Sequence, residues 1–152
     1  MILPILIHPD PVLRQKAEAV SVFDGELHAL LKDMQDTMMA SSGIGLAAPQ
    51  VGVLKRVIVV AYKNRRLSLI NPEIILCEGT AVSPEGCLSL PNFNTEVSRF
   101  FNIVVKARNK LGRWIKIKEK DMVARIIQHE IDHLNGILIL DHQSKKESED
   151  IS

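Results

Sequence analysis

Apolar residues recur at helical spacing in two segments of the chain. In residues 25–41 the repeat falls on Leu27, Leu30, Leu31, Met34 and Met38, with a glycine just beyond it. Residues 121–136 have Asp121 as the expected N-cap and end at Asn135-Gly136; most sides of this helix are apolar, through Met122, Val123, Ile126, Ile127, Ile131 and Leu134. Both patterns predict helices. A helix that is apolar on several sides is buried, so the second one is expected inside the domain.

Between these helical patterns the chain shows the alternation that is typical of strands. Residues 56–62 and 67–75 predict two strands joined by a basic turn, and residues 102–120 predict a hairpin around an Asn-Lys-Leu-Gly turn. A short helical turn is expected after Pro11. In the hairpin, lysines and arginines alternate with isoleucine and valine. That pattern favours a solvated sheet face over a nucleic-acid-binding patch.

Length and composition fit one globular domain. The chain has 152 residues, of which 46% are apolar and 24% charged, and its net charge of +1 does not indicate DNA or an acidic membrane as the main partner. The apolar opening lacks a basic region and is interrupted by prolines, and no later run reaches membrane-spanning length. We therefore expect a cytoplasmic location, where Cys77 and Cys87 stay reduced.

The sequence His-Glu-Ile-Asp-His in the second helix suggests a metal site. Its two histidines, His129 and His133, are four residues apart, so they share one helix face and could bind the same ion. This short pattern also occurs by chance, but the predicted burial favours ligation because buried imidazoles need partners. A third ligand could come from Asp141 or His142 downstream. Cys87, upstream, is the better candidate because it can offer a thiolate.

Three motifs occur in a characteristic order: GIGLAAPQ at 43–50, EGCLS at 85–89 and QHEIDHLNG at 128–136. Together with HPDPVLRQKA near the start, they resemble the peptide deformylase family over nearly the whole chain. The resemblance implies an α+β fold, in which antiparallel β-sheets wrap around the central metal-binding helix and a second helix lies near the N-terminus. It also implies a metal-dependent hydrolase that removes the formyl group from the N-terminal formyl-methionine of newly made polypeptides.

The resemblance assigns the metal ligands. Cys87, His129 and His133 are expected to bind one divalent ion and to leave a position for water, which is the arrangement of a catalytic site. Fe²⁺ is expected in the cell, and Zn²⁺, Ni²⁺ or Co²⁺ can occupy the same ligands. A thiolate ligand also exposes a ferrous site to oxidation.

The resemblance further implies three groups that act on the substrate amide. Glu130 is expected to be the general base towards water and then the general acid towards the leaving amine. The side chain of Gln50 and the backbone N–H of Leu88 are expected to bind the oxygen that becomes negative.

Substrate-binding positions also follow from the resemblance. Gly43, Gly45 and Gly86 would let the substrate peptide approach the backbone closely as an added strand. The methionine side chain is expected in an apolar pocket formed by Ile44, Met122, Ile126 and the stem of Arg125.

The chain departs from the family pattern at two places. Asn94 occupies a position where the family usually carries an arginine, which puts recognition beyond the methionine in question. There is also no basic C-terminal docking helix, so contact with the ribosome is expected to be transient at most. We expect one catalytic domain in residues 1–142, a polar disordered tail in residues 143–152, and a monomer.

Two alternatives follow from the metal motif alone. A metallopeptidase of the H-E-x-x-H type would cleave internal peptide bonds without needing Cys87. A non-catalytic metal-binding domain would use the three ligands without turnover. Glu130 and Gln50 argue against the second alternative, because neither is needed merely to hold a metal.

Overall fold

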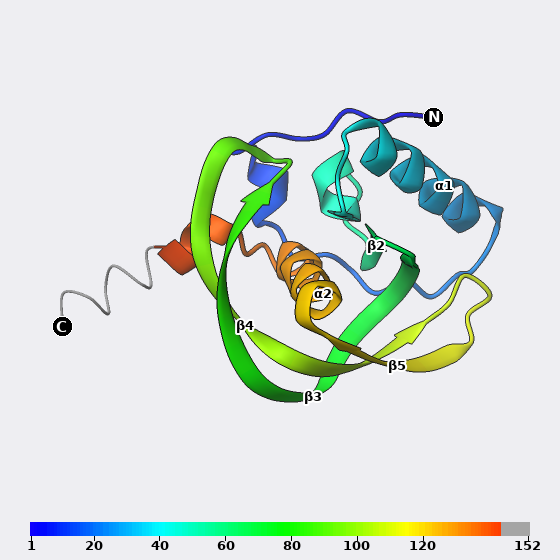
Figure 1. Ribbon diagram of the computed structural model, residues 1–152. Helices are drawn as coiled ribbons and strands as arrows, with labels where there is room; N and C mark the ends of the chain where they lie inside the picture. Colours follow the sequence, from blue (N-terminus) through cyan, green and yellow to red (C-terminus); the bar gives the residue numbers. More distant parts are fainter. Residues whose placement is uncertain (144–152) are drawn as a thin grey trace.

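The computed structural model describes residues 1–143, in which one antiparallel sheet curls around a helix (Figure 1). The sheet order is β1-β2-β3-β4-β5. The elements are η1 (Pro11–Arg14), α1 (Gly25–Ala40), β1 (Gly45–Ala47), η2 (Ala48–Val51), β2 (Val57–Tyr62), β3 (Arg65–Cys87), β4 (Leu90–Arg108), β5 (Trp114–Lys120) and α2 (Asp121–Leu134). The predicted tail lies outside the described residues, except for Gln143.

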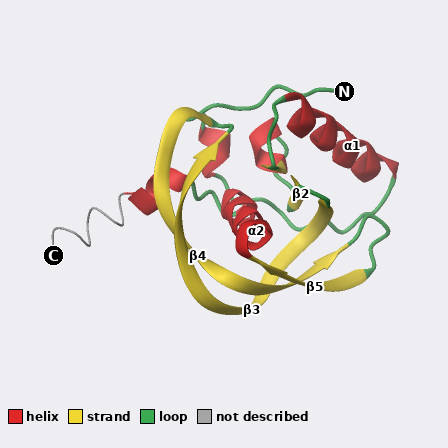
Figure 2. Cartoon of the chain, in the orientation of Figure 1, coloured by secondary structure: helices red, strands yellow, loops and turns green. Residues whose placement is uncertain are grey.

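The predicted α+β architecture is confirmed. The sheet bends so that its concave side faces α2, while α1 packs outside the bend against β1 and β2 (Figures 1 and 2). The apolar residues of α2 meet those of β2 and β4 in one core cluster, which includes Ile58, Val105 and Ile127. A second cluster joins Leu31 and Met34 of α1 to the other side of β2. Helix α2 therefore lies at the centre, as its apolar pattern predicts.

Strands β3 and β4 are much longer than predicted. They form an antiparallel ribbon of 23 and 19 residues that runs from Ile70 and Arg108 to the pair Cys87 and Leu90. Its far part has mostly exposed side chains on both strands, so the chain there lacks the apolar alternation by which a strand is predicted. The ribbon ends beside α2 and brings Cys87 to that helix.

The start of α2 differs slightly from the prediction. Lys120, not Asp121, occupies the N-cap position, and its side chain makes no capping hydrogen bond. Asp121 is the first helical residue and places its carboxylate in the first turn. The prediction of Asp121 as the N-cap is therefore wrong by one residue. No helix in residues 1–143 is both long enough and apolar enough to span a membrane.

Candidate active site

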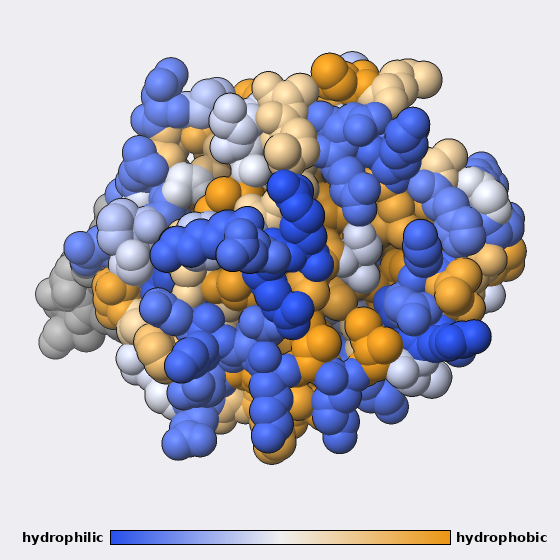
Figure 3. Space-filling view, turned by 45° about the vertical axis from the view of Figure 1, so that its right-hand side comes forward, coloured by the Kyte–Doolittle hydropathy of each residue, from blue (hydrophilic) through white to orange (hydrophobic). Residues whose placement is uncertain are grey.

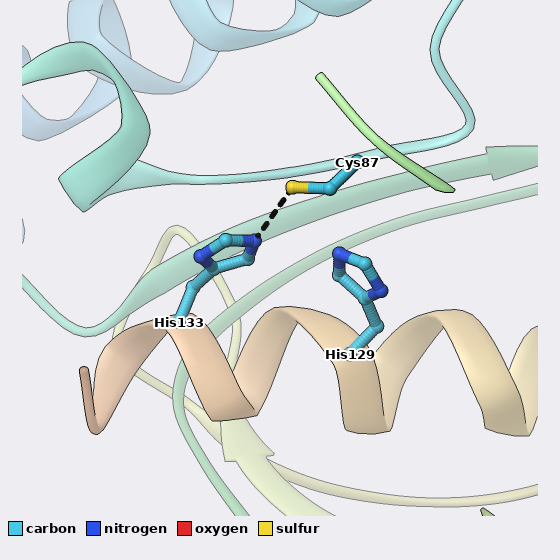
Figure 4. Close-up of side chains that lie close together, drawn as sticks. All are labelled: Cys87, His129 and His133. Atoms are coloured by element: carbon cyan, nitrogen blue, oxygen red, sulfur yellow. Dashed lines mark hydrogen bonds between the residues drawn. The ribbon is translucent and has the colours of Figure 1, made fainter. Parts of the chain in front are cut away.

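The three predicted metal ligands converge at the end of β3 and on one face of α2. The Sγ atom of Cys87 lies 3.3 Å from Nε2 of His133, and both histidine rings point towards the cysteine (Figure 4). One potential ligand atom from each of Cys87, His129 and His133 lies within 4.8 Å of the others. Ligands bound at about 2.0–2.3 Å to one tetrahedral ion are separated by about 3–4 Å. The donor set therefore fits a divalent ion such as iron or zinc.

The downstream alternatives for the third ligand lie elsewhere. Asp141 forms an ion pair with Arg14, at 2.6 Å between carboxylate and guanidinium. His142 contacts Asp132 through Nε2 at 3.0 Å. Neither belongs to the group of potential ligands around His129.

Glu85 fixes the orientation of His129. Its Oε1 lies 2.9 Å from Nδ1 of that histidine, which leaves Nε2 free for the metal. Burial alone would raise the pKa of Glu85, but hydrogen bonds from His129 and Arg99 outweigh burial and hold that pKa well below its ordinary value. Glu85 is therefore ionised and can support a cation that is bound to His129.

The two ligand histidines differ in charge preference. Burial lowers the pKa of His129, but the neighbouring Glu130, Cys87 and Glu85 outweigh burial and raise this pKa to about 10. Burial and the adjacent His129 lower the pKa of His133 to about 3. The surroundings of His129 thus favour a positive charge on or beside its ring. Either a proton or a metal ion can supply this charge, because the two compete for the same ring nitrogen.

Arg99, on β4, joins Glu85 to helix α2. Its guanidinium makes two bonds to the Glu85 carboxylate, from Nε at 3.0 Å and from Nη2 at 2.9 Å. It also donates from Nη1 to Asp132 at 2.6 Å. Because Asp132 adjoins His133, this buried ion-pair network ties both ends of the ligand set to the ribbon.

Glu130 is buried at 4% exposure and points towards the cavity beside the ligands. Its Oε1 has no hydrogen-bond partner among the described atoms. Burial raises the pKa of its carboxyl to about 7, despite the favourable charge of His129. A carboxyl group with a pKa in this range can both accept and donate a proton near neutral pH.

Strand β1 passes directly over this carboxylate. A Cβ atom built on Gly45 would lie 2.5 Å from Oε2 of Glu130 and 2.7 Å from Ile126. A Cβ on Gly43 would lie 2.9 Å from a Leu88 methyl group. The two glycines thus allow the backbone to form a close wall of the cavity.

Gln50 lies in η2, and both the oxygen and the nitrogen of its side-chain amide are hydrogen-bonded. Its Oε1 accepts a hydrogen bond from the Ala47 N–H at 3.0 Å. Its Nε2 donates to Ser89 Oγ at 3.1 Å and lies 3.7 Å from Cys87 Sγ. The amide N–H donors therefore face the ligand group, and Leu88 lines the same cavity.

A cavity of about 380 Å³ opens beside these groups. All seven predicted substrate-binding residues line it: Gly43, Ile44, Gly45, Gly86, Met122, Arg125 and Ile126. The guanidinium of Arg125 nevertheless points into the protein, where Nη1 donates to Glu85 at 2.6 Å and to the Val97 carbonyl at 2.9 Å. Asn94 lies opposite Gly86 in the β3–β4 register.

Comparison with known proteins decides the family. A family model described as polypeptide deformylase matches residues 2–149. The chain belongs to the peptide deformylase family. A peptide deformylase of Thermodesulfovibrio yellowstonii is 50% identical over 145 residues, covering 92% of this chain and 88% of the relative. One from Heliobacterium modesticaldum is 50% identical over 137 residues, covering 90% and 91%.

Solved structures agree with this assignment. The crystal structure of peptide deformylase from Thermotoga maritima aligns with a TM-score of 0.91 at 41% identity, covering 93% of this chain and 97% of that one. Peptide deformylases are metal-dependent hydrolases. The chain accordingly removes the formyl group from the N-terminal formyl-methionine of nascent polypeptides.

Sequence patterns missed one part of this peptide deformylase site. Glu85, Arg99 and Asp132 were not predicted to surround the ligands, and Arg125 was expected only as a pocket wall. One signal was available for Glu85, because a ligand histidine usually needs a carboxylate or carbonyl partner and this residue precedes Cys87 by two positions. The sequence offered no comparable signal for Arg99, which reaches the network only through the fold of the ribbon.

Proposed function

We propose that Cys87, His129 and His133 hold one divalent ion for the deformylation reaction, and that this ion is Fe²⁺ in the cell. Zn²⁺, Ni²⁺ or Co²⁺ would occupy the same ligands. The observation that carries the proposal is the position of Glu130, a buried carboxyl group with one unpartnered oxygen, beside three convergent ligand atoms. When bound, such an ion polarises water and the formyl oxygen.

The cavity walls would position the substrate. We infer that the peptide backbone lies between the Gly43–Gly45 segment and Gly86, where the glycines leave room for close approach. The methionine side chain would occupy the apolar part, formed by Ile44, Met122 and Ile126 together with the stem of Arg125. Because the Arg125 head group is engaged with Glu85, only its methylene groups are available to the substrate.

Glu130 would carry the proton. Its carboxylate would take a proton from the attacking water and deliver it to the methionine amine as the C–N bond breaks, releasing formate. Burial keeps its pKa at about 7, so the transfer in each direction costs little near neutral pH.

Gln50 and Leu88 would stabilise the charge on the formyl oxygen. We infer that the Gln50 amide donates one hydrogen bond and the backbone N–H of Leu88 a second as this oxygen becomes negative. The bonds from Ala47 and to Ser89 hold the Gln50 amide before substrate arrives, so little reorganisation is required.

A single assay separates this function from the two alternatives. The protein is incubated under anaerobic conditions with formyl-Met-Ala-Ser, and with the same peptide lacking the formyl group, while formate and new amines are measured. Formate from the first peptide and no cleavage of the second is the expected result. Internal cleavage of either peptide would indicate a metallopeptidase, and no product with full metal content would indicate a non-catalytic domain.

The ligand assignment has its own test. Alanine at any one of Cys87, His129 or His133 should remove most bound metal and most activity together. Cys77, the other free cysteine, is exposed and provides the matched control for Cys87. A Cys87→Ala protein with stoichiometric metal and normal turnover would defeat the assignment. Elemental analysis of anaerobically purified protein identifies the metal.

We further infer that residues 1–142 act as a monomeric catalytic unit that needs no stable docking helix. Sedimentation of the protein at several concentrations tests the monomer. Removing residues 143–152 should leave kcat/KM on short formyl-Met peptides within about twofold, because surface changes rarely exceed about 0.5 kcal/mol. It should also leave co-sedimentation with ribosomes unchanged; weaker co-sedimentation would show that the tail mediates contact.

A further inference from the structure

Charge is distributed unevenly along this chain. Residues 102–120 contain seven of the 19 basic residues and one of the 18 acidic residues, although the whole chain carries a net charge of only +1. The rest of the molecule therefore has an excess of acidic groups. These residues form the end of β4, the turn and the whole of β5.

The strand register places the basic side chains on one face. Lys106 lies opposite Lys116, Val104 opposite Lys118, and Asn102 opposite Lys120, so these residues share the outer side of the sheet. All four lysines are exposed. Figure 3 shows hydrophilic side chains standing side by side along the lower part of the molecule, where Figure 1 places the sheet. We call Lys106, Arg108, Lys116, Lys118 and Lys120 the basic face.

The charges of the basic face have no acidic partner within the described fold, although Lys106 contacts the Trp114 ring and Arg108 contacts the rings of Trp114 and Phe23. In the part of the chain from 1 to 143, none of its five residues forms an ion pair. The single acidic residue of the hairpin, Glu119, lies on the other face of β5 and forms an ion pair with Arg65. Glu73, on β3, lies opposite Lys106 without forming an ion pair. Two lysines directly opposite each other destabilise a sheet, so the pairing of Lys106 with Lys116 does not itself stabilise the hairpin.

Protection of the sheet edge accounts for only part of this arrangement. β5 ends the sheet, and lysines on an edge strand discourage pairing with other chains. However, Lys106 and Arg108 lie on β4, which has a neighbour on each side. Lys110 and Arg113 lie in the turn and extend the same positive region. Edge protection requires none of these four.

An exposed tryptophan lies at the end of the basic face. Trp114 is 56% exposed, although Lys106 Nζ and the Arg108 guanidinium lie 4.6 and 4.7 Å from its ring centroid. Exposed aromatic rings beside basic side chains stack with nucleic-acid bases. Alternate residues on one strand are separated by about 6.6 Å, so Lys116, Lys118 and Lys120 form a regular row of single charges.

We propose that the basic face binds the phosphate backbone of RNA, contrary to the expectation from the sequence, in which the alternation of this hairpin favours a solvated sheet face over a nucleic-acid-binding patch. The row of lysines neutralises successive phosphates, and the Trp114 ring offers a surface for a base. Because the contacts are to the backbone, this binding is independent of RNA sequence and sensitive to salt. The face lies on the convex side of the sheet, away from the cavity, so RNA and a formyl-methionyl peptide can be bound together.

The test measures binding of the full chain to a short RNA hairpin, which has a paired stem and a loop of unpaired bases, over about 50–200 mM salt. The test variant carries Lys106→Gln, Lys116→Gln and Lys118→Gln. The control carries Lys16→Gln, Lys32→Gln and Lys55→Gln, which are equally exposed and change the net charge by the same amount. The test variant should bind at least tenfold more weakly, and its plot of log affinity against log salt should be shallower by about 2. The control should bind like the unchanged protein.

Other readouts distinguish RNA from other anionic partners. Deformylation of a short formyl-Met peptide should be unchanged in both variants, which shows that both are folded. Equal weakening in the two variants would overturn the proposal, because only net charge would then matter. Tighter binding of the unchanged protein to poly-glutamate, or to phosphatidylserine vesicles, than to RNA would overturn it in favour of an acidic protein or a membrane.

Discussion

Buried polar groups lie on two sides of helix α2, and the two sides differ in how completely those groups are hydrogen-bonded. On the cavity side, Glu130 Oε1 has no hydrogen-bond partner among residues 1–143. On the ribbon side, Arg99 makes three bonds to carboxylates, and Arg125 bonds to Glu85 and to two backbone carbonyls. The groups on both sides are buried to a similar extent, so burial alone does not explain the difference in hydrogen bonding.

The difference separates groups that stabilise the fold from groups reserved for a reactant. Buried polar groups are almost always satisfied, and an unsatisfied one therefore needs a reason. The fully bonded ribbon side fixes the position of α2. We interpret the incompletely bonded cavity side as the part of the molecule that is available to a proton, a metal or a substrate. Variants on the two sides should consequently fail in different ways.

The largest effect is expected at Glu130. Glu130→Gln keeps the shape of the side chain and the three proposed metal ligands but removes the proposed proton carrier, a loss of about 10²–10⁴-fold in rate. Metal content and unfolding free energy should stay near those of the unchanged protein. Formate release and elemental analysis measure the two outcomes. If metal is lost together with activity, Glu130 belongs with the structural side of the comparison.

Glu85→Gln should produce the opposite result. Removing this charge leaves two buried guanidinium groups without their shared carboxylate, which costs about 3–5 kcal/mol of unfolding free energy. Metal affinity should fall about 10–100-fold, because His129 loses the group that orients it. Urea unfolding and chelator competition provide the measurements. Glu78→Gln, an exposed glutamate on the same strand, is the matched control and should change neither.

Gln50→Leu tests whether this amide belongs with the reactive groups. Loss of one donor to the developing negative charge costs about 10²–10³-fold in kcat. Gln35→Leu removes an exposed amide and should leave kcat unchanged. A change confined to KM would mean that Gln50 contacts the substrate equally before and during the reaction, and the proposed role would be wrong.

The smallest effect is expected at the outer end of the network. His142→Phe removes the contact with Asp132, which is partly exposed, so the loss of unfolding free energy should be about 1 kcal/mol or less. Metal release to a chelator should nevertheless become faster, because Asp132 adjoins His133. Arg14→Gln is the control: it removes the ion pair with Asp141, next to His142, but leaves the network of Glu85, Arg99 and Asp132 unchanged. Equal metal release in both variants would show that only the turn matters.

Local spacing predicted the reactive side well. The interval between His129 and His133 and the apolar pattern of α2 are contained in one helix, and the motifs around Gln50 and Cys87 are short. The geometry brings those residues together, as the motifs indicate, while their individual roles stay predictions. The location of the methionine pocket is likewise a prediction, although the expected residues line one cavity.

The ribbon side could not be predicted because its contacts join strands β3 and β4 to each other and to helix α2 across 14 to 44 residues of the sequence. Glu85 and Arg99 lie on the two paired strands of a ribbon that is longer than predicted, since exposed strands lack apolar alternation. Arg125 has helical spacing that directs it towards the pocket, while the Glu85 carboxylate and two backbone carbonyls of the ribbon hold its guanidinium inward. Long-range pairing of charges depends on the fold and not on sequence periodicity.

Gly45 has a consequence for anyone who engineers the thermal stability of this protein. Replacing glycine by alanine is a standard stabilising change, worth about 0.4–1 kcal/mol where the backbone allows it. Gly45 meets the backbone condition, since its φ angle is not among the positive values found at four other glycines. Its added methyl group would nevertheless collide with the Glu130 carboxylate. A design procedure guided by backbone angles alone would select this position and displace Glu130, the proposed proton carrier.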